Sequence, residues 1–295
     1  MIYWPAFDFS YSLDMSRLLP HIAAIEAFRT AASLSLRPPQ WREIPAAEGG
    51  EPALPLSAGN QQEITNEIQL RKERALLSNT GRDRAWVRQR FVPGCEPLSV
   101  EDILHMHRLV AEDTGIRYDS AGRFRREGLR VMVGTPQTGI HAGAPAEKLP
   151  HLMAQFVQLV NGRTLLSMIP AVHALVAHYF FTTIHPFDDG NGRVSRLVAA
   201  GILFWRGYSG HGYYALFNYF YHNEERYHRL VYQTQQKPCP DLTDFVAFGL
   251  EGLAVELQGI NNFIKVRLQR TAEREILTPV LRERMGPRQK HNGDF

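Results

Sequence analysis

Residues 185–196, near the middle of the chain, have side chains and a spacing suited to chemistry on a phosphate ester. They read His-Pro-Phe-Asp-Asp-Gly-Asn-Gly-Arg-Val-Ser-Arg. Gly190 and Gly192 permit backbone conformations and close approaches that a Cβ would obstruct. Apolar residues recur at helical spacing over residues 193–206, so the glycines lead into a helix N-terminus. Its free N–H groups and dipole favour an anion, most often phosphate.

Charged and titratable side chains surround this turn. Arg193 and Arg196 lie three positions apart on the first helical turn, where both guanidinium groups can reach phosphate oxygens. Asp189 suits Mg²⁺, which one carboxylate and substrate phosphate oxygens commonly hold. His185 titrates near neutrality and could accept a proton from an attacking hydroxyl. The combination predicts phosphoryl or nucleotidyl transfer. The alternative is a helix end, a turn and a solvated face with no common ligand.

The same twelve residues resemble the signature of the Fic family, which has a histidine, a phenylalanine, an acid, Gly-Asn-Gly-Arg and a second arginine. The resemblance extends over residues 95–255 and is looser before them. It implies an all-α Fic fold, with a small β-hairpin flap and an N-terminal helical extension. It also implies a protein adenylyltransferase, which moves AMP from ATP to a Ser, Thr or Tyr hydroxyl of a target protein and releases pyrophosphate.

The resemblance implies a role for each residue of the motif. His185 would be the base that deprotonates the target hydroxyl, and Asp189 would hold Mg²⁺ against the α and β phosphates. Phe187 would anchor the loop in the core. The residues that would bind the phosphates are Gly190, Asn191 and Gly192 in the anion hole, and Arg193 and Arg196 at the β and γ positions.

Gly192 also bears on the type of transfer, because the related Doc kinases have lysine there and bind ATP in another orientation. Glycine favours AMP transfer over phosphorylation. Transfer of UMP, phosphocholine or phosphate, and removal of AMP, are alternatives within enzymes. A non-catalytic module that binds nucleotide is an alternative of another class. The intact His185 and Asp189 argue against it, since a degenerate motif would be expected there.

A β-hairpin is predicted before the motif. Leu129, Val131 and Val133 alternate as in a strand, and residues 135–143 can turn the chain back. Residues 129–143 resemble the Fic flap, which pairs with an extended segment of the target protein. Val133 would then face the nucleotide. An ordinary connecting hairpin is the alternative.

Residues 218–230 resemble the Fic segment whose two tyrosines and a later amide line the adenine pocket. The match is partial, because His228 stands at the second tyrosine and the amide falls near Gln235. Tyr227, His228 and Gln235 are candidates for adenine contacts, with core packing as the alternative. His173 and His178 lack the spacing of a zinc-binding helix, so we interpret them as structural.

The inhibitory helix of many Fic proteins has Ser or Thr, three residues, Glu, then Gly or Asn. Here Leu54 and Ala58 occupy the Ser/Thr and Glu positions. We therefore expect Arg196 to be available to the γ phosphate and the enzyme to be weakly restrained. Inhibition by another element or by a separate inhibitor (an antitoxin) stays open, as does a homodimer. Glutamates that could act as a brake elsewhere are Glu26, Glu63 and Glu275.

The composition sets further limits. The chain has 295 residues, of which 44% are hydrophobic, enough for a sizeable core. A formal charge of +3 is too small to imply nucleic acid or a membrane surface as partner. Cys95 and Cys239 form no metal or redox pattern. The N-terminus lacks the layout of a signal peptide, and no apolar run reaches the roughly 18 residues of a membrane span. We expect a cytoplasmic protein.

Hydrophobic periodicity predicts helices over residues 14–36, 60–78, 82–92, 98–113, 147–159, 170–184, 193–206, 241–257 and 259–284. Ser99 and Asp102 predict a capping box at the start of the fourth of these helices. Residues 1–13 are predicted to be an extended aromatic strap, and residues 44–59 a linker. We divide the chain into an N-terminal strap, helices and linker (1–94), a Fic core domain (95–258) and a C-terminal helix and tail (259–295).

Overall fold

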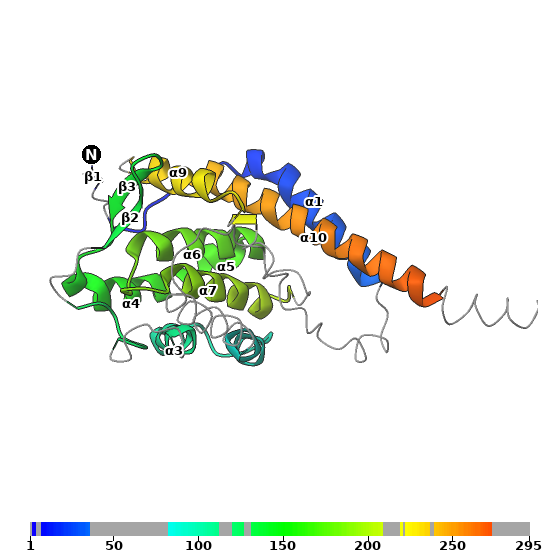
Figure 1. Cartoon of the computed structure of the whole chain (residues 1–295), viewed down its shortest axis with the longest axis horizontal. Helices are drawn as coiled ribbons and strands as arrows, with labels where there is room; N and C mark the ends of the chain where they lie inside the picture. The colour runs from blue at the N-terminus through cyan, green and yellow to red at the C-terminus, as the bar shows by residue number, and fades with distance from the viewer. Residues whose placement is uncertain are drawn as a thin grey trace, which may run out of the picture.

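The computed structural model describes residues 2–3, 7–35, 82–111, 120–126, 131–208, 219–220, 222–236 and 239–272. This part of the chain consists of packed helices with one small sheet at an end of the body (Figure 1). The predicted helical class with a β-hairpin is confirmed. The predictions over residues 44–59 and 60–78 and for the C-terminal tail lie outside the described residues.

Two helices, α6 (Pro170–Ile184) and α7 (Asn191–Trp205), pack against each other at the centre of the body. Every residue of α6 after Pro170 is buried, which accounts for its almost continuous apolar sequence. Pro170 lies in the first turn, where a missing N–H costs little. The bounds of α6 match the prediction. Helices packed against this pair include α3 (Val100–Ala111), α4 (Leu149–Val160), α5 (Arg163–Ser167) and α10 (Thr243–Ala272).

The start of α3 has the predicted capping box. The Asp102 N–H donates to Ser99 Oγ at 3.0 Å, and the Ser99 N–H donates to Asp102 Oδ2 at 2.9 Å. Arg90, in a helix over residues 82–90, donates to both carboxylate oxygens of Asp102 at 2.8 Å. These bonds pair backbone N–H groups at the N-terminus of α3 and join α3 to the helix over residues 82–90.

The N-terminal residues lie on the core as predicted. Phe7 and Phe9 pack against it, and the rings of Phe9 and Phe180 are 5.2 Å apart. The helix α1 (Met15–Ser35) follows, and it lies along α10 (Thr243–Ala272) (Figure 1). The Asp14 N–H donates to Thr243 Oγ1 at 2.8 Å, so the starts of the two helices are joined.

The prediction of two helices over residues 241–257 and 259–284 is wrong, because α10 continues through Gly259. A Cβ at Gly259 would meet nothing within 4 Å, so no close packing requires a glycine there. A glycine inside a helix costs only about 1 kcal/mol. The packing of α10 along α1 opposes that cost.

The sheet has three short strands in the order β1-β3-β2. The strands are β1 (Ile2–Tyr3), β2 (Met132–Thr135) and β3 (Gly139–Ala142). The antiparallel pair β2–β3 is the predicted hairpin, and it lies beside α9 (Glu224–Gln235) (Figure 1). The parallel partner β1 is an addition that the sequence did not predict, since residues 1–13 were expected only to pack on the core. A short 3₁₀ helix, η1 (Ala146–Lys148), connects the hairpin to α4.

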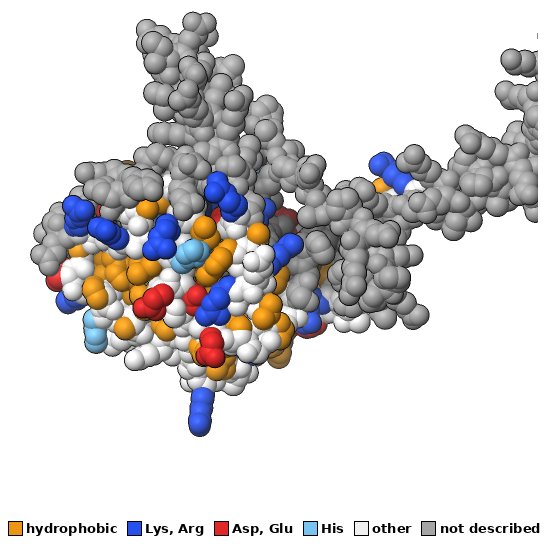
Figure 2. All heavy atoms as spheres, turned by 90° about the horizontal axis from the view of Figure 1, so that it is seen from below, with side chains coloured by type: hydrophobic (Ala, Val, Ile, Leu, Met, Phe, Trp, Pro, Cys, Tyr) orange, Lys and Arg blue, Asp and Glu red, His pale blue; other side chains and the backbone are white. Residues whose placement is uncertain are grey.

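Acidic and basic side chains are interspersed on the face seen in Figure 2, without one large patch of a single sign. No helix in the described part of the chain is long and apolar enough to cross a membrane.

Candidate active site

His185 caps the C-terminus of α6 and begins the loop that leads to α7. Its backbone is left-handed, with φ 54° and ψ 63°, which is uncommon for a residue with a Cβ. The helix ends here because Pro186 disfavours a helical conformation of the residue before it. The cap turns the chain sharply, so the loop after α6 returns to the start of α7.

The imidazole of His185 can accept a proton at Nε2. Nδ1 lies 3.3 Å from the Thr182 carbonyl oxygen, and because a carbonyl only accepts, Nδ1 carries the hydrogen. Burial lowers the pKa of His185 to about 4; the Thr182 carbonyl and Asp189 act in the opposite direction, whereas Arg125 and His228 lower it further. At neutral pH the ring is therefore neutral, with its lone pair on Nε2.

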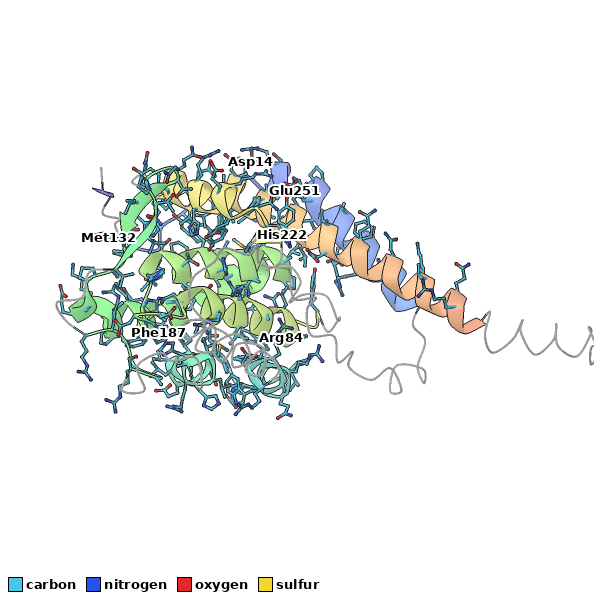
Figure 3. The ribbon with its side chains drawn as sticks, viewed as in Figure 1. Asp14, Arg84, Met132, Phe187, His222 and Glu251 are labelled. Atoms are coloured by element: carbon cyan, nitrogen blue, oxygen red, sulfur yellow. The ribbon has the colours of Figure 1, made fainter. Side chains whose placement is uncertain are left out.

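Asn191 closes the loop between α6 and α7. Its side-chain oxygen accepts a hydrogen bond from the Phe187 N–H at 2.9 Å, and its amide donates to the Phe187 carbonyl at 2.7 Å. Phe187 is fully buried, as predicted for the anchor of the loop, and Figure 3 shows it within the helical body. The polar atoms of Asn191 thus shape the loop by holding the backbone of Phe187.

The N-terminus of α7 has the shape of an anion cradle. Gly190 caps the helix with φ 79°, and a Cβ there would lie 3.2 Å from Val110 Cγ1. Left-handed backbone and close packing together require glycine at this position. At Gly192 a Cβ would contact Arg196 Nη1 at 3.4 Å, so glycine keeps the space beside the first turn open. The first amides of α7 can donate to an anion placed there.

The charges around the cradle come from three elements. Arg193 Nη2 lies 3.7 Å from Asp189 Oδ1, and Arg193 Nη1 donates to the Val110 carbonyl at 3.3 Å. Asp83, from the helix over residues 82–90, is only 6% exposed. Burial raises the pKa of Asp83, while Arg193 and Arg196 are near enough to lower it. Asp83 was not singled out in the sequence, and it is the buried acid that interacts with both motif arginines.

Asp189 fits the role of a magnesium ligand. Its side chain is 68% exposed, and Oδ1 accepts a hydrogen bond from the Gly190 N–H. A hard carboxylate oxygen at an open position is the donor that Mg²⁺ prefers. The described residues contain no group of three or more His, Cys, Asp or Glu that could hold a metal ion. An open carboxylate of this kind would suit a cation whose remaining ligands are phosphate oxygens and water.

His107 of α3 contacts the loop between α6 and α7. The sequence did not predict this role. The Gly122 N–H donates to Nδ1 at 2.9 Å, so the hydrogen lies on Nε2, which donates to the Asp189 carbonyl at 3.1 Å. The ring stacks on Phe187 with centroids 3.8 Å apart and an interplanar angle of 4°. Burial lowers the pKa of His107 to about 4, so the neutral ring that makes these bonds prevails at neutral pH.

The candidates for contacts with the adenine ring lie along α9 and the flap. Tyr227 donates or accepts hydrogen bonds with His178 Nε2 at 3.0 Å and Thr182 Oγ1 at 3.3 Å. Gln235 is buried and donates to Thr183 Oγ1 at 3.1 Å. Both side chains thus connect α9 to α6, as the alternative of core packing describes.

His228 and Val133 differ from these two. His228 is partly exposed and lies 3.5 Å from Glu224 Oε1, and its charge would act on His185. Val133 is buried and pairs directly with His141 across the hairpin, so the two side chains share the inner face of the flap. His228 is therefore an α9 candidate whose charge would act on His185.

A cavity of about 610 Å³ lies between the β2–β3 turn and α9. Its walls include Gln137, Ile140, Arg229 and Gln233, and no residue of the motif lines it. The motif itself is a surface cradle at the start of α7, with exposed Asp189 and Gly192 beside it.

A family model described as Fic/DOC family matches residues 97–203, from just before α3 to near the end of α7. This part of the chain belongs to the Fic/DOC family. Two similar curated Fic proteins are the protein adenylyltransferase Fic of Drosophila ananassae, 37% identical over 111 residues, and the protein adenylyltransferase fic-1 of Caenorhabditis briggsae, 35% identical over 111 residues. Each match covers 38% of this chain, which spans only 20% of either relative.

Solved structures share the fold. A Fic family protein from Desulfovibrio desulfuricans G20 aligns with a TM-score of 0.57 and 20% identity, over 86% of this chain and 76% of that one. Fic-1 from C. elegans aligns with a TM-score of 0.54 and 19% identity, over 86% of this chain and 73% of that one. The Fic fold thus includes regions outside the span of the family model.

Proposed function

We propose that the chain is a protein adenylyltransferase that moves AMP from ATP to a Ser, Thr or Tyr hydroxyl of a target protein. The observation that carries the proposal is the placement of a neutral His185, with Nε2 available as acceptor, directly before the anion cradle at the start of α7. A base and a polyphosphate site joined by one short loop suit nucleotidyl transfer. The Fic relatives named as adenylyltransferases favour AMP as the group transferred.

In the proposed reaction the target hydroxyl oxygen attacks the α phosphorus of ATP. The bond from that phosphorus to the oxygen shared with the β phosphate breaks, pyrophosphate leaves, and the hydroxyl proton passes to His185 Nε2. The amides at the start of α7, with Arg193 and Arg196, bind the phosphate oxygens. Mg²⁺ bound at Asp189 would neutralise charge on the α and β phosphates. The candidates for contacts with the adenine ring remain Tyr227, His228, Gln235 and Val133.

The flap would present the target segment. In the described sheet β3 lies between β1 and β2, so β2 is the strand of the hairpin with an unpaired edge. Met132 on β2 is 41% exposed. A target segment could add to this edge through backbone hydrogen bonds, which would place a hydroxyl without a deep substrate pocket.

The proposed inhibition is weak. Of the three glutamates that could act as a brake, Glu26 is described: it accepts a hydrogen bond from the Tyr208 hydroxyl and pairs with Arg29 at 2.6 Å. These contacts give Glu26 a role in joining α1 to the end of α7. Glu63 and Glu275 lie outside the described residues, as do Leu54 and Ala58. Replacing any of the three glutamates by glycine should not raise activity many-fold.

Intact-mass analysis tests the reaction. The protein is incubated with Mg²⁺ and, in turn, ATP, UTP or CDP-choline, and wild type is compared with His185→Ala and with His151→Ala, which removes an exposed histidine of α4. We expect an AMP adduct that requires ATP, is lost in His185→Ala and persists in His151→Ala. An adduct from UTP or CDP-choline instead would change the transferred group. Nucleotide binding by calorimetry with no adduct on the protein or on added target candidates would favour the non-catalytic module.

A further inference from the structure

Arg125 lies in the segment between α3 and the flap and is only 4% exposed. Its Nε donates to the His185 carbonyl at 2.9 Å, and its Nη2 donates to the Ala144 carbonyl. Its backbone N–H donates to the Pro186 carbonyl at 3.0 Å. One buried residue thus bonds the base, the residue after it and the end of the flap.

The end of the flap is packed directly on the base. The Ala144 N–H donates to the Ile184 carbonyl at 3.0 Å. A Cβ at Gly143 would lie 3.1 Å from His185 Cβ and 3.2 Å from Arg125 Nη2. No side chain fits between the flap, the guanidinium group and His185, so a displacement of one requires a displacement of the others.

Physical chemistry explains why arginine is needed. A buried cation is costly unless its donors are bonded, and the carbonyls of His185 and Ala144 bond two arms of the guanidinium group. A planar fork can hold two acceptors in fixed directions, which a lysine ammonium on a flexible stem does less well. The left-handed backbone of His185 is strained for a residue with a Cβ and persists only where the surroundings impose it. The bond to its carbonyl is one of those constraints.

We propose that Arg125 is a positioning residue that couples the flap to the base, so that the target strand on the flap and the imidazole of His185 keep a fixed relative geometry. The inference rests on the proposed adenylyl transfer. Arg125 makes none of the contacts of the anion cradle described above, so its effect should fall on the transfer step and not on nucleotide binding.

The charge of Arg125 has a separate effect from its geometry. It lowers the pKa of His185, in addition to burial, while Asp189 raises it and His228 lowers it. His141 on β3 also interacts with His185. Removing the positive charge should therefore raise the pKa of the base and move the acid limb of the activity profile to higher pH.

Two substitutions separate geometry from charge. Arg125→Lys keeps the charge and loses the fork, and Arg125→Gln loses both. Arg123→Lys and Arg123→Gln are matched controls, since Arg123 is exposed two residues earlier in the same segment. The measurements are kcat and KM for AMP transfer to the target or to the chain itself, the pH profile of kcat, and the calorimetric Kd for a non-hydrolysable ATP analogue with Mg²⁺.

We expect Arg125→Lys to lower kcat by about 10²-fold, the scale of a misplaced catalytic group, with an unshifted acid limb and a Kd within about twofold of wild type. Arg125→Gln should lower kcat and also move the acid limb to higher pH. If Arg125→Gln does not fold, Gly143→Ala provides the second test: its Cβ presses on His185 while the charge remains, so kcat should fall with no shift of the acid limb.

Wild-type kcat in Arg125→Lys would overturn the inference, and so would a loss of kcat matched by an equal weakening of ATP-analogue binding, which indicates a general structural role. Failure of the proposed function looks different. In that case neither wild type nor the Arg123 controls transfer AMP at any pH, and the coupling to a base is refuted together with the reaction.

Discussion

The contacts of His107 lead to a prediction of magnitude. The His107 ring stacks on Phe187 with centroids 3.8 Å apart. The substitution His107→Phe keeps an aromatic ring at this position and removes two hydrogen bonds. The bond to the Asp189 carbonyl is worth about 1 kcal/mol, and the buried Gly122 N–H left without its acceptor costs about 1–3 kcal/mol. The free energy of unfolding should therefore fall by roughly 2–4 kcal/mol.

Urea unfolding at pH 7.5 measures this difference, because His107 is neutral there in both folded and unfolded chains. His105→Phe is the matched control: the same change on the same helix, at a half-buried residue whose ring lies 4.6 Å from that of Trp86. It should change the free energy of unfolding by less than about 0.5 kcal/mol. The Mg²⁺ concentration for half-maximal AMP transfer should rise in His107→Phe, because the Asp189 backbone loses its anchor.

Equal stabilities of the two variants would refute the reasoning, since the bonds to Gly122 and Asp189 would then contribute nothing to holding the loop. A loss of stability in His107→Phe with an unchanged Mg²⁺ dependence would limit the role of His107 to the fold. It would also remove the link between α3 and the cation site.

Three further predictions follow from single contacts. Asp83→Asn removes a negative charge that interacts with both motif arginines, so the calorimetric Kd for ATP should decrease; an unchanged or larger Kd would contradict this. Gly190→Ala and Gly207→Ala both impose a left-handed alanine, at about 1–2 kcal/mol, but only Gly190 would also crowd a neighbour, so urea unfolding should show the larger loss for Gly190→Ala. Stability should decrease as the pH falls from about 6.5 towards 3, because burial lowers the pKa of His173 and His178 to about 3 and the unfolded chain therefore binds protons first. Equal free energies of unfolding at pH 7.5 and pH 5 would contradict that prediction.

Local signals in the sequence were sufficient for much of the fold. The capping residues Ser99 and Asp102 marked the start of α3, and Pro170 with an apolar run marked α6. These features act within a few residues, so their consequences can be derived without tertiary structure. The continuity of α10 could not be derived in this way, because the surface that stabilises it past Gly259 belongs to α1, far away in the sequence.

For the same reason, only part of the candidate site could be predicted from the sequence. His185, Asp189 and the glycines lie within one short stretch, so their types and spacing indicated chemistry. His107 is 82 positions from Asp189, and Arg125 is 60 positions from His185. One signal was present: His107 occupies a position on α3 that is buried together with Ile103 and Val110, where a polar residue needs a partner.

The loop between α6 and α7 is held from three directions, and this bears on how the reaction can be controlled. Asn191 closes it from within, His107 holds the Asp189 backbone from α3, and Arg125 holds the His185 backbone from the flap side. The first constraint belongs to the motif, whereas the other two come from α3 and from the segment that precedes the flap. Only Arg125 also contacts the flap, where a target would pair. We therefore expect displacement of His107 or Arg125 to lower the proposed transfer even when every motif residue is intact, and a target bound at the flap to act on His185 through Arg125.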